Sequence, residues 1–256
     1  MTMKREADTK IVDLARVKAV CKECSLRELC LPLGLAQTDL AALEQAIKRT
    51  HKVKKGDFLY RIGEPMASLY ALRAGSAKTY EISLGGDVQI TGFHLAGELL
   101  GMDGISTSRH HCDAVALESS EVCEIPFDNL EELAREIPGL QHQLFRILGR
   151  EIVQDGELLL MLGKMNAEER LAACLLSFSR RFSRLGRSAT DFTLSMSRQD
   201  LGDYLGLALE TVSRLFSRFQ EEGLLTVESR RVSLLDLPSL RTMAGDYGDS
   251  LGNLSN

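Results

Sequence analysis

SRQDLGDYLGLALETVSRLFSRFQEEG, residues 197–223, has the hydrophobic pattern of two short helices joined by a tight turn. Gly206 stands between the two helices, and glycine readily adopts the left-handed backbone conformation that such a turn favours. Two short strands are expected directly after it, at residues 224–227 and 231–235. The stretch therefore predicts a helix-turn-helix followed by a strand pair. Its expected buried residues are Leu201, Leu205, Leu207, Val212, Leu215, Phe216 and Phe219.

The second helix carries a polar face with the chemistry for reading DNA bases. Glu210, Ser213, Arg214 and Ser217 recur at helical spacing opposite the apolar residues. Arg214 can bind the O6 and N7 atoms of guanine, Glu210 can accept from the amino group of cytosine, and Leu209 can contact a thymine methyl. We expect this helix to enter the major groove of double-stranded DNA.

Arginines around the two helices are candidates for phosphate contacts, which position a protein on DNA without specifying the sequence. They are Arg198, Arg218, Arg230 and Arg231. The alternative interpretation of the whole stretch is a helical hairpin whose polar face is simply solvated. The turn glycine, the buried pattern and the following strand pair favour DNA recognition.

A long helix is predicted upstream, between residues 138 and 165, where no proline follows Pro138. A stripe at alternating four- and three-residue steps has the spacing of a coiled-coil seam. One helix cannot bury such a stripe alone, so we expect a symmetric homodimer in which each acid of the stripe faces its own copy. The predicted interface residues are Leu144, Leu148, Glu151, Asp155, Leu158 and Leu162.

Residues 51–125 change to short apolar runs separated by glycines, such as Gly63, Gly75 and Gly97. Repeated short strands with turn residues at these intervals predict an all-β sandwich or roll.

The composition is that of an ordinary globular chain: 256 residues, 44% hydrophobic and 26% charged. No apolar run approaches the roughly 20 residues that span a bilayer, and no signal peptide is evident, so we expect a cytoplasmic protein without membrane contact. The net charge of −5 argues against a broadly basic nucleic-acid-coating surface. DNA binding must then rest on a local site.

Three cysteines, Cys21, Cys24 and Cys30, stand close together near the N-terminus. Thiolates are soft ligands that suit zinc and iron–sulfur clusters. A structural zinc site usually takes its remaining ligands from a second C-x₂-C or H-x₃₋₅-H pair, which this chain lacks. A cluster tolerates one remote cysteine, so the spacing favours iron–sulfur over zinc and over a bare thiol switch.

The fourth ligand has three candidates in the sequence. Cys174 lies in the apolar helix RLAACLLSF and is expected to be a core residue. Cys112 and Cys123 both lie near the end of the β region, and spacing does not separate them.

The order of cysteine segment, β-roll, long helix and winged helix resembles the CRP/FNR superfamily of transcription regulators, specifically its oxygen-sensing FNR/ANR branch. The segments that carry the resemblance are CKECSLRELCLPLGL, QITGFHLAGELLG, VCEIPF, NAEERLAACLLSFSRRF and LGLALETVSRLFSRFQ. The resemblance implies an α+β fold: an N-terminal cyclic-nucleotide-binding-like β-roll, a long dimerisation helix and a C-terminal winged helix-turn-helix. It also implies that the protein is not an enzyme.

The implied domains are an N-terminal iron–sulfur ligand segment (1–35), a β-roll sensor domain (36–138), a dimerisation helix (139–166) and a winged helix-turn-helix domain (167–243). The small, polar and glycine-rich tail at 244–256 is expected to be disordered.

The resemblance places the four cluster ligands on Cys21, Cys24, Cys30 and Cys123. It implies a 4Fe-4S cluster that holds a dimer together without oxygen and converts to a 2Fe-2S form in its presence, after which the protein becomes monomeric and releases DNA. Asp155 matches the interface aspartate of the family. In a dimer this residue would repel its copy in the partner subunit, and assembly of the cluster must offset that repulsion.

Further implications concern the macromolecular partners. Glu210, Ser213 and Arg214 match base-contacting positions, which implies a palindrome resembling TTGAT…ATCAA. The loop at residues 83–87 matches a surface implicated in contacting RNA polymerase.

Two rival functions remain to be weighed. A cyclic-nucleotide-responsive regulator is suggested by Gly97, Glu98 and Leu99, but the chain has His111, Cys112 and Asp113 where that branch holds the cyclic phosphate, and an acid there would repel it. A redox enzyme would need a second redox centre or a catalytic pocket, and neither is apparent in the sequence.

Overall fold

The computed structural model describes residues 21, 24, 26 and 30–245. Residues 1–20 of the predicted ligand segment lie outside the described residues, as does the predicted disordered tail from residue 246 onward.

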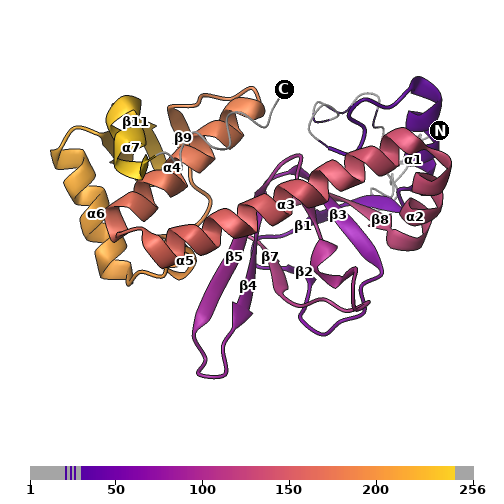
Figure 1. Cartoon of the computed structure of the whole chain (residues 1–256), viewed down its shortest axis with the longest axis horizontal. Coiled ribbons are helices and arrows are strands. Elements are labelled where there is room, and N and C mark those ends of the chain that lie inside the picture. Colours follow the sequence, from indigo (N-terminus) through magenta and orange to yellow (C-terminus); the bar gives the residue numbers. More distant parts are fainter. Residues whose placement is uncertain (1–20, 22–23, 25, 27–29, 246–256) are drawn as a thin grey trace, which may run out of the picture.

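Two four-stranded antiparallel sheets form the β-roll (Figure 1). Buried residues alternate along Asp113–Ala116 of one sheet and along most of Ser120–Pro126 of the other, so each sheet turns one face inward. The first sheet has the order β1 (Arg49–Val53), β8 (Ser120–Pro126), β3 (Ser68–Ala74), β6 (Leu99–Leu100); the second has the order β2 (Phe58–Tyr60), β7 (Asp113–Ala116), β4 (Ser76–Ile82), β5 (Val88–Leu95). A short 3₁₀ helix, η3 (Met102–Gly104), follows β6.

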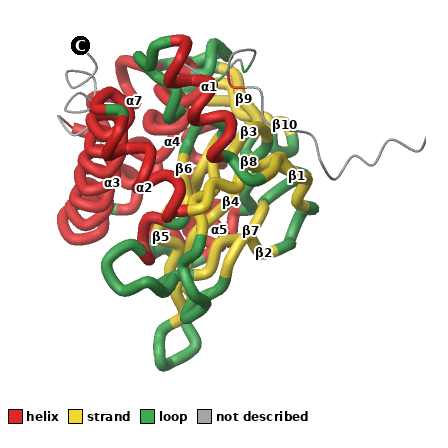
Figure 2. Tube along the Cα trace, turned by 90° about the vertical axis from the view of Figure 1, so that its right-hand side faces the viewer, coloured by secondary structure: helices red, strands yellow, loops and turns green. Residues whose placement is uncertain are grey.

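Three helices pack around the first sheet. They are α1 (Gln37–Ala46), α2 (Phe127–Glu136) and α3 (Pro138–Lys164). Pro138 lies in the first turn of α3, where a proline costs no hydrogen bond. Figure 2 shows α2 and α3 on one side of the strands. Their buried residues share a core with Cys21, Leu31 and Ile125, so the cysteine segment is part of this packing.

The C-terminal region contains the predicted helix-turn-helix. Capping boxes begin α4 (Ala167–Arg184) at Asn166 and α5 (Arg198–Leu205) at Ser197. Gly206 ends α5 in the left-handed conformation, with φ of 63°, and α6 (Leu209–Glu221) follows. The predicted strand pair is present as β10 (Leu225–Glu228) and β11 (Arg231–Leu234), joined by a strand that the pattern did not indicate, β9 (Asp191–Thr193), and followed by α7 (Leu237–Ala244).

One hydrophobic core crosses from the roll into the C-terminal helices. Ile90, Phe93 and Leu95 of β5 belong to the same core as Leu175 of α4 and Leu201 of α5. The ring centroids of Phe93 and Tyr204 lie 5.0 Å apart. The β4–β5 hairpin therefore packs directly against the helix-turn-helix.

The predicted α+β class, with an N-terminal roll, a long helix and a C-terminal helix-turn-helix, is confirmed (Figure 1). None of the described helices combines the length and the apolar content that a membrane span requires.

Candidate functional site

The polar face of α6 is fully presented to solvent. Val212, Leu215 and Phe219 are buried, whereas Glu210 and Arg214 are exposed. Ser213 is also exposed, and Leu209 at the start of the helix is 39% exposed. Six of the seven predicted buried residues are buried, with 8% exposure or less, and the seventh, Leu207 in the turn, is half-buried. The six are Leu201, Leu205, Val212, Leu215, Phe216 and Phe219.

The helices α5 and α6 form a tight unit. A Cβ atom added to Gly202 would lie 2.5 Å from the carbonyl oxygen of Leu207, so only glycine allows this close approach. Arg170 of α4 further ties the unit to α3, because its guanidinium donates to the carbonyl oxygens of Leu205, Leu162 and Met165 at 2.8, 2.8 and 2.9 Å. Sequence reasoning did not identify Arg170, since carbonyl contacts leave no periodic signal.

The candidate phosphate-binding arginines already have partners in the protein. The Arg198 guanidinium stacks 3.1 Å from the ring centroid of Phe216, and burial lowers its pKa to about 10. Arg218 pairs with Glu222 at 2.7 Å and also with Glu168. Phosphate contacts by Arg218 would therefore compete with two ion pairs.

The two remaining candidates are held as well. Arg231 binds both carboxylate oxygens of Asp191, at 2.8 and 2.7 Å, and Arg230 donates to the Ser195 carbonyl oxygen at 2.9 Å. These bonds fix the strand pair against β9.

A second candidate site lies at the opposite end of the chain, where Cys21, Cys24, Cys30 and Cys123 line one cavity. The remaining lining is mostly apolar and includes Leu31, Leu43, Ile47, Ala71, Leu72 and Ile125. Arg73 also lines this cavity and pairs with Glu121 at 3.3 Å. All six cysteines of the described region are free of disulfides.

Four thiols around one cavity are a donor set that an iron–sulfur cluster takes. No three His, Cys, Asp or Glu side chains converge on one ion position within the described residues. A cube of iron and sulfide carries its protein thiolates at its corners and so needs them around a cavity rather than around a point. The apolar lining also suits a cluster, because it limits the access of solvent.

Burial favours the protonated form of three of these thiols, Cys21, Cys30 and Cys123. Burial, helped by the neighbouring thiols, raises the pKa of Cys21 and of Cys30 to about 12, and burial also raises the pKa of Cys123. The Cys123 sulfur lies 3.7 Å from the Thr50 hydroxyl. Binding a metal centre here would therefore release protons.

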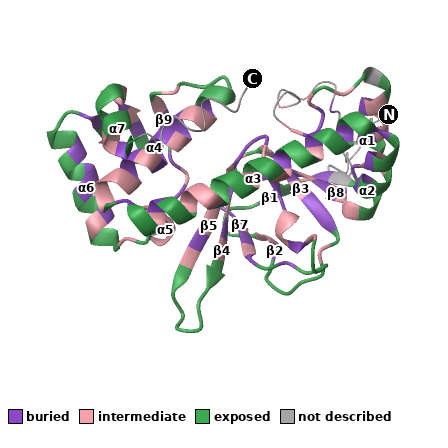
Figure 3. Cartoon of the chain, viewed as in Figure 1, coloured by how far each residue is buried: buried purple, intermediate pink, exposed green. Residues whose placement is uncertain are grey.

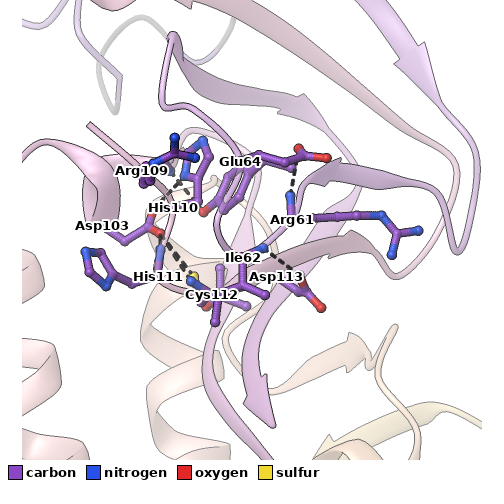
Figure 4. Close-up of polar contacts among 12 residues, drawn as sticks. Arg61, Ile62, Glu64, Asp103, Arg109, His110, His111, Cys112 and Asp113 are labelled. Atoms are coloured by element: carbon purple, nitrogen blue, oxygen red, sulfur yellow. Dashed lines mark hydrogen bonds and ion pairs between the residues drawn. The ribbon is translucent and has the colours of Figure 1, made fainter. Parts of the chain in front are cut away.

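Cys112, the other cysteine that spacing allowed as a ligand, lies in a different core with Tyr60 and Ala114. Its thiol donates to the Asp103 carboxylate at 3.5 Å (Figure 4). The same carboxylate lies 3.2 Å from the His110 ring nitrogen and accepts from the His111 amide at 2.7 Å. These hydrogen bonds to Asp103 fix the loop between η3 and β7. Cys112 is not among the residues that line the cavity of Cys21, Cys24, Cys30 and Cys123.

The apolar side chains that α3 exposes differ from those of the predicted dimer stripe. Leu144 packs against the N-terminal core and Leu158 against the C-terminal one. The most exposed large hydrophobic side chains of α3 recur every seven residues instead: Phe145 at 63%, Ile152 at 71% and Leu159 at 73%, each above 60%, while Val153 and Leu160 are less exposed. Leu144 and Leu158 contact the chain's own cores, so the exposed apolar stripe is shifted by one residue. Figure 3 shows exposed segments recurring along α3.

The other four predicted interface residues fall at the border of the exposed stripe. Asp155 is exposed, and Leu148, Glu151 and Leu162 are half-buried. Glu151 lines a cavity with Glu98, Arg150 and Arg181, and it is turned toward the chain's own interior.

The remnant of the cyclic-nucleotide cassette has a structural partner. The Arg181 guanidinium of α4 binds both oxygens of the Glu98 carboxylate, at 2.9 and 2.5 Å, and the Leu95 amide donates to the same group. Burial alone would raise the pKa of Glu98, but the charge of Arg181 holds it below the ordinary value. Asp113, at the position expected to repel a cyclic phosphate, accepts from the Ile62 amide (Figure 4).

Two family models match regions of this chain. A model of the Crp-like helix-turn-helix domain matches residues 169–243, and one of the cyclic nucleotide-binding domain matches residues 50–136. The transcriptional activator protein Anr of Pseudomonas aeruginosa is 48% identical over 228 residues, covering 89% of this chain and 93% of that protein.

Two further similarities extend over most of the chain. The fumarate and nitrate reduction regulatory protein of Salmonella typhimurium is 45% identical over 225 residues, or 88% of this chain and 90% of that one. The structure of FixK2 from Bradyrhizobium japonicum superimposes with a TM-score of 0.71 at 30% identity, covering 77% of this chain and 96% of that chain. The chain therefore belongs to the CRP/FNR family of transcription regulators, DNA-binding proteins rather than enzymes.

Proposed function

We propose that this chain is an oxygen-responsive transcription regulator that assembles a 4Fe-4S cluster on Cys21, Cys24, Cys30 and Cys123 under anaerobic conditions. With the cluster it forms a homodimer and binds a palindrome resembling TTGAT…ATCAA. The observation that carries the proposal is the single apolar cavity lined by all four cysteines.

The cluster, when bound, supplies a centre that oxygen converts or destroys. The protein's own residues provide the rest. Cys21, Cys24 and Cys30 come from the N-terminal segment and Cys123 from β8, so the four thiols connect this segment to the roll. Arg73 adds the charge that offsets thiolates in the same cavity.

A direct contact joins the cysteine segment to α3. The side-chain amide of Gln143, which is 2% exposed, donates to the Cys30 carbonyl oxygen at 3.3 Å. Leu31, Leu140 and Ile147 lie in the same core. A change at the cysteines can therefore reach the helix proposed to form the dimer interface.

The proposed dimer interface is the exposed stripe of Phe145, Ile152 and Leu159, with Asp155 beside it. Two copies of Asp155 facing each other would repel, which keeps the dimer weak until the cluster offsets the cost. Switching a population from almost fully off to almost fully on takes about 5.5 kcal/mol of differential binding. Four thiolate bonds are a plausible source of that amount.

DNA recognition is assigned to Glu210, Ser213 and Arg214, supported by their joint exposure on α6. The tip of the β4–β5 hairpin, where Leu84 is fully exposed, is the proposed contact with RNA polymerase.

The experiment that tests the proposal is purification under strict exclusion of air, with iron and sulfide analysis, visible spectroscopy and a mobility-shift assay before and after exposure to air. We expect a coloured protein that shifts the palindrome, and loss of both properties in air. A colourless, iron-free preparation that binds the palindrome equally well with and without oxygen would refute it.

A further inference from the structure

We propose that Lys78 of β4 is a positioning residue for DNA binding: its ion pair with Asp200 fixes the orientation of the helix-turn-helix relative to the roll and α3. The Lys78 ammonium lies 2.5 Å from the Asp200 carboxylate. Both side chains are largely buried, at 20% and 15% exposure, so water screens the pair weakly. The proposal rests on the proposed function, because it concerns how a dimer reads two half-sites.

Asp200 stands at the point where the first helix of the module begins. Its second carboxylate oxygen accepts from the amide and the hydroxyl of Ser197, at 2.7 and 2.6 Å, in the capping box of α5. Lys78 thus binds Asp200 in the first turn of α5, the residue that completes this capping box. Although burial alone would raise the pKa of Asp200, the bonds from Lys78 and Ser197 lower it, so the carboxylate is ionised at neutral pH.

The position of α5 determines that of α6. The Leu207 amide donates to the Gly202 carbonyl oxygen at 3.0 Å, and only a glycine at position 202 fits against the Leu207 carbonyl, so the turn that leads into α6 is bound closely to α5. A residue that fixes the start of α5 therefore fixes the base-reading side chains Glu210 and Arg214 as well.

Neighbouring contacts from the same hairpin act in the same direction. The Ser76 hydroxyl, on the same face of β4 as Lys78, donates to the Ser195 hydroxyl at 2.6 Å. The Gln89 side-chain amide donates to the Tyr204 carbonyl oxygen at 3.4 Å. The hairpin thus touches α5 near both ends, and Lys78 makes the charged contact at its start.

This arrangement leaves both functional surfaces open at once. The apolar stripe of α3 and the polar face of α6 are both exposed while Lys78 and Asp200 are paired. We therefore assign the ion pair to the arrangement that binds DNA and not to an inhibited one.

A dimer gains affinity from the second half-site only if its two recognition helices are held at the matching separation. Loss of the Lys78–Asp200 ion pair in each subunit lowers this gain in affinity but leaves each recognition helix folded. Half-site spacing is thus the readout that separates a positioning role from a merely structural one.

The test uses full-length protein prepared without air and palindromes whose spacer is varied one base pair at a time, beside a single half-site. For Lys78→Met we expect about tenfold weaker binding at the preferred spacing, less than threefold change on the half-site, and a flatter dependence on spacing. Lys78→Arg should restore the selectivity. Lys55→Met, which removes an exposed lysine of the same roll, is the matched control and should behave as the wild type.

Asp200→Asn provides a second, independent variant, because the amide oxygen can still accept from Ser197 while the charge for Lys78 is lost. The double variant Lys78→Met/Asp200→Asn should bind no more weakly than either single variant, as expected for two residues that act through one contact. Equal weakening on the half-site and on every palindrome, unchanged spacing selectivity, or tighter binding would each overturn the proposal.

Hydrogen–deuterium exchange of residues 198–205 in the free protein makes the result separable from the proposed function. Lys78→Met should exchange several-fold faster there, whatever DNA the protein binds. Unchanged exchange in Lys78→Met would overturn the positioning role. If instead the variant exchanged faster but the wild type showed no preference for any spacing, only the proposed palindrome binding would be refuted.

Discussion

Cys112 and Cys123 are close in sequence and differ in what surrounds them. Cys123 lines the cavity of the other three cysteines, whereas Cys112 donates to Asp103 in a separate core. We predict that Cys123→Ser abolishes iron and sulfide binding in anaerobic preparations. Cys112→Ser should retain full iron content, since a hydroxyl can keep the bond to Asp103. Equal iron loss in both variants would contradict the ligand assignment.

Glu151 is a carboxyl group whose ionised form the fold disfavours. Burial, then Glu98 and Asp155, raise the pKa of its carboxyl from 4.5 to about 7. The unfolded chain ionises this group near 4.5, so the wild type loses stability as the pH rises from 4.5 to about 7.

Glu151→Gln should remove this loss. We expect the variant to match the wild type at pH 4 and to exceed it by about 1–3 kcal/mol at pH 8, from about 1.4 kcal/mol per pKa unit. Urea unfolding of the air-exposed protein across this range measures the difference. Glu132→Gln, at an exposed position of α2, is the control, and a pH-independent gap between Glu151→Gln and wild type would exclude this explanation.

At the scale of the element, α3 shows what periodicity can and cannot predict. Its existence and its span follow from the uninterrupted pattern after Pro138. Two adjacent stripes share the four-three spacing, however, and the stripe that is exposed contains Gly149, Gly156 and Gly163 between its apolar residues. A Cβ added at any of these glycines would meet no atom within 4 Å. Because glycine gives no hydrophobic signal, the sequence pattern indicated the neighbouring stripe.

The same helix yields a prediction about association. Asp155→Ala should shift the protein toward dimer and toward DNA binding in air, because it removes the repulsion between two copies. Adding Ile152→Ser, at a side chain that is 71% exposed, should reverse the effect while leaving monomer stability within about 0.5 kcal/mol. Analytical ultracentrifugation in air measures both changes. An Asp155→Ala protein that remains monomeric would argue against the proposed face.

The helix-turn-helix was predictable almost residue by residue, because Gly206 and a strict buried pattern are local signals. The cysteine cavity was predictable in part: spacing indicated three candidate ligands and the family resemblance indicated Cys123, whose place beside them depends on how β8 pairs with β1 and β3. Pairings between distant strands leave no periodic trace in a single sequence.

Over the whole molecule, polar pairs between distant segments hold the roll to the C-terminal module. The clearest is Arg181 with Glu98, whose side chains are 12% and 30% exposed. Arg181 also donates to the Phe93 carbonyl oxygen. None of these partners lies at a spacing that a sequence pattern detects.

Arg181→Met should lower the free energy of unfolding by about 2–3 kcal/mol, because it leaves the Glu98 carboxylate unpaired. The loss lies below that of a fully buried pair, since Glu98 keeps some exposure. The double variant Arg181→Met/Glu98→Leu should recover part of it, and chemical denaturation measures both. If the double variant proved no more stable than Arg181→Met, the loss would come from packing instead of charge.

The core that Ile90 and Phe93 share with Leu175 and Leu201 has a consequence for how this architecture can be recombined. In a chimera that exchanges residues 167–243 alone, a foreign helix-turn-helix domain would pack against a β4–β5 hairpin whose side chains fit the original domain. Transplanting a new operator preference into this regulator would require grafting residues 76–95 together with the module, so that its two helices arrive with the support that fits them.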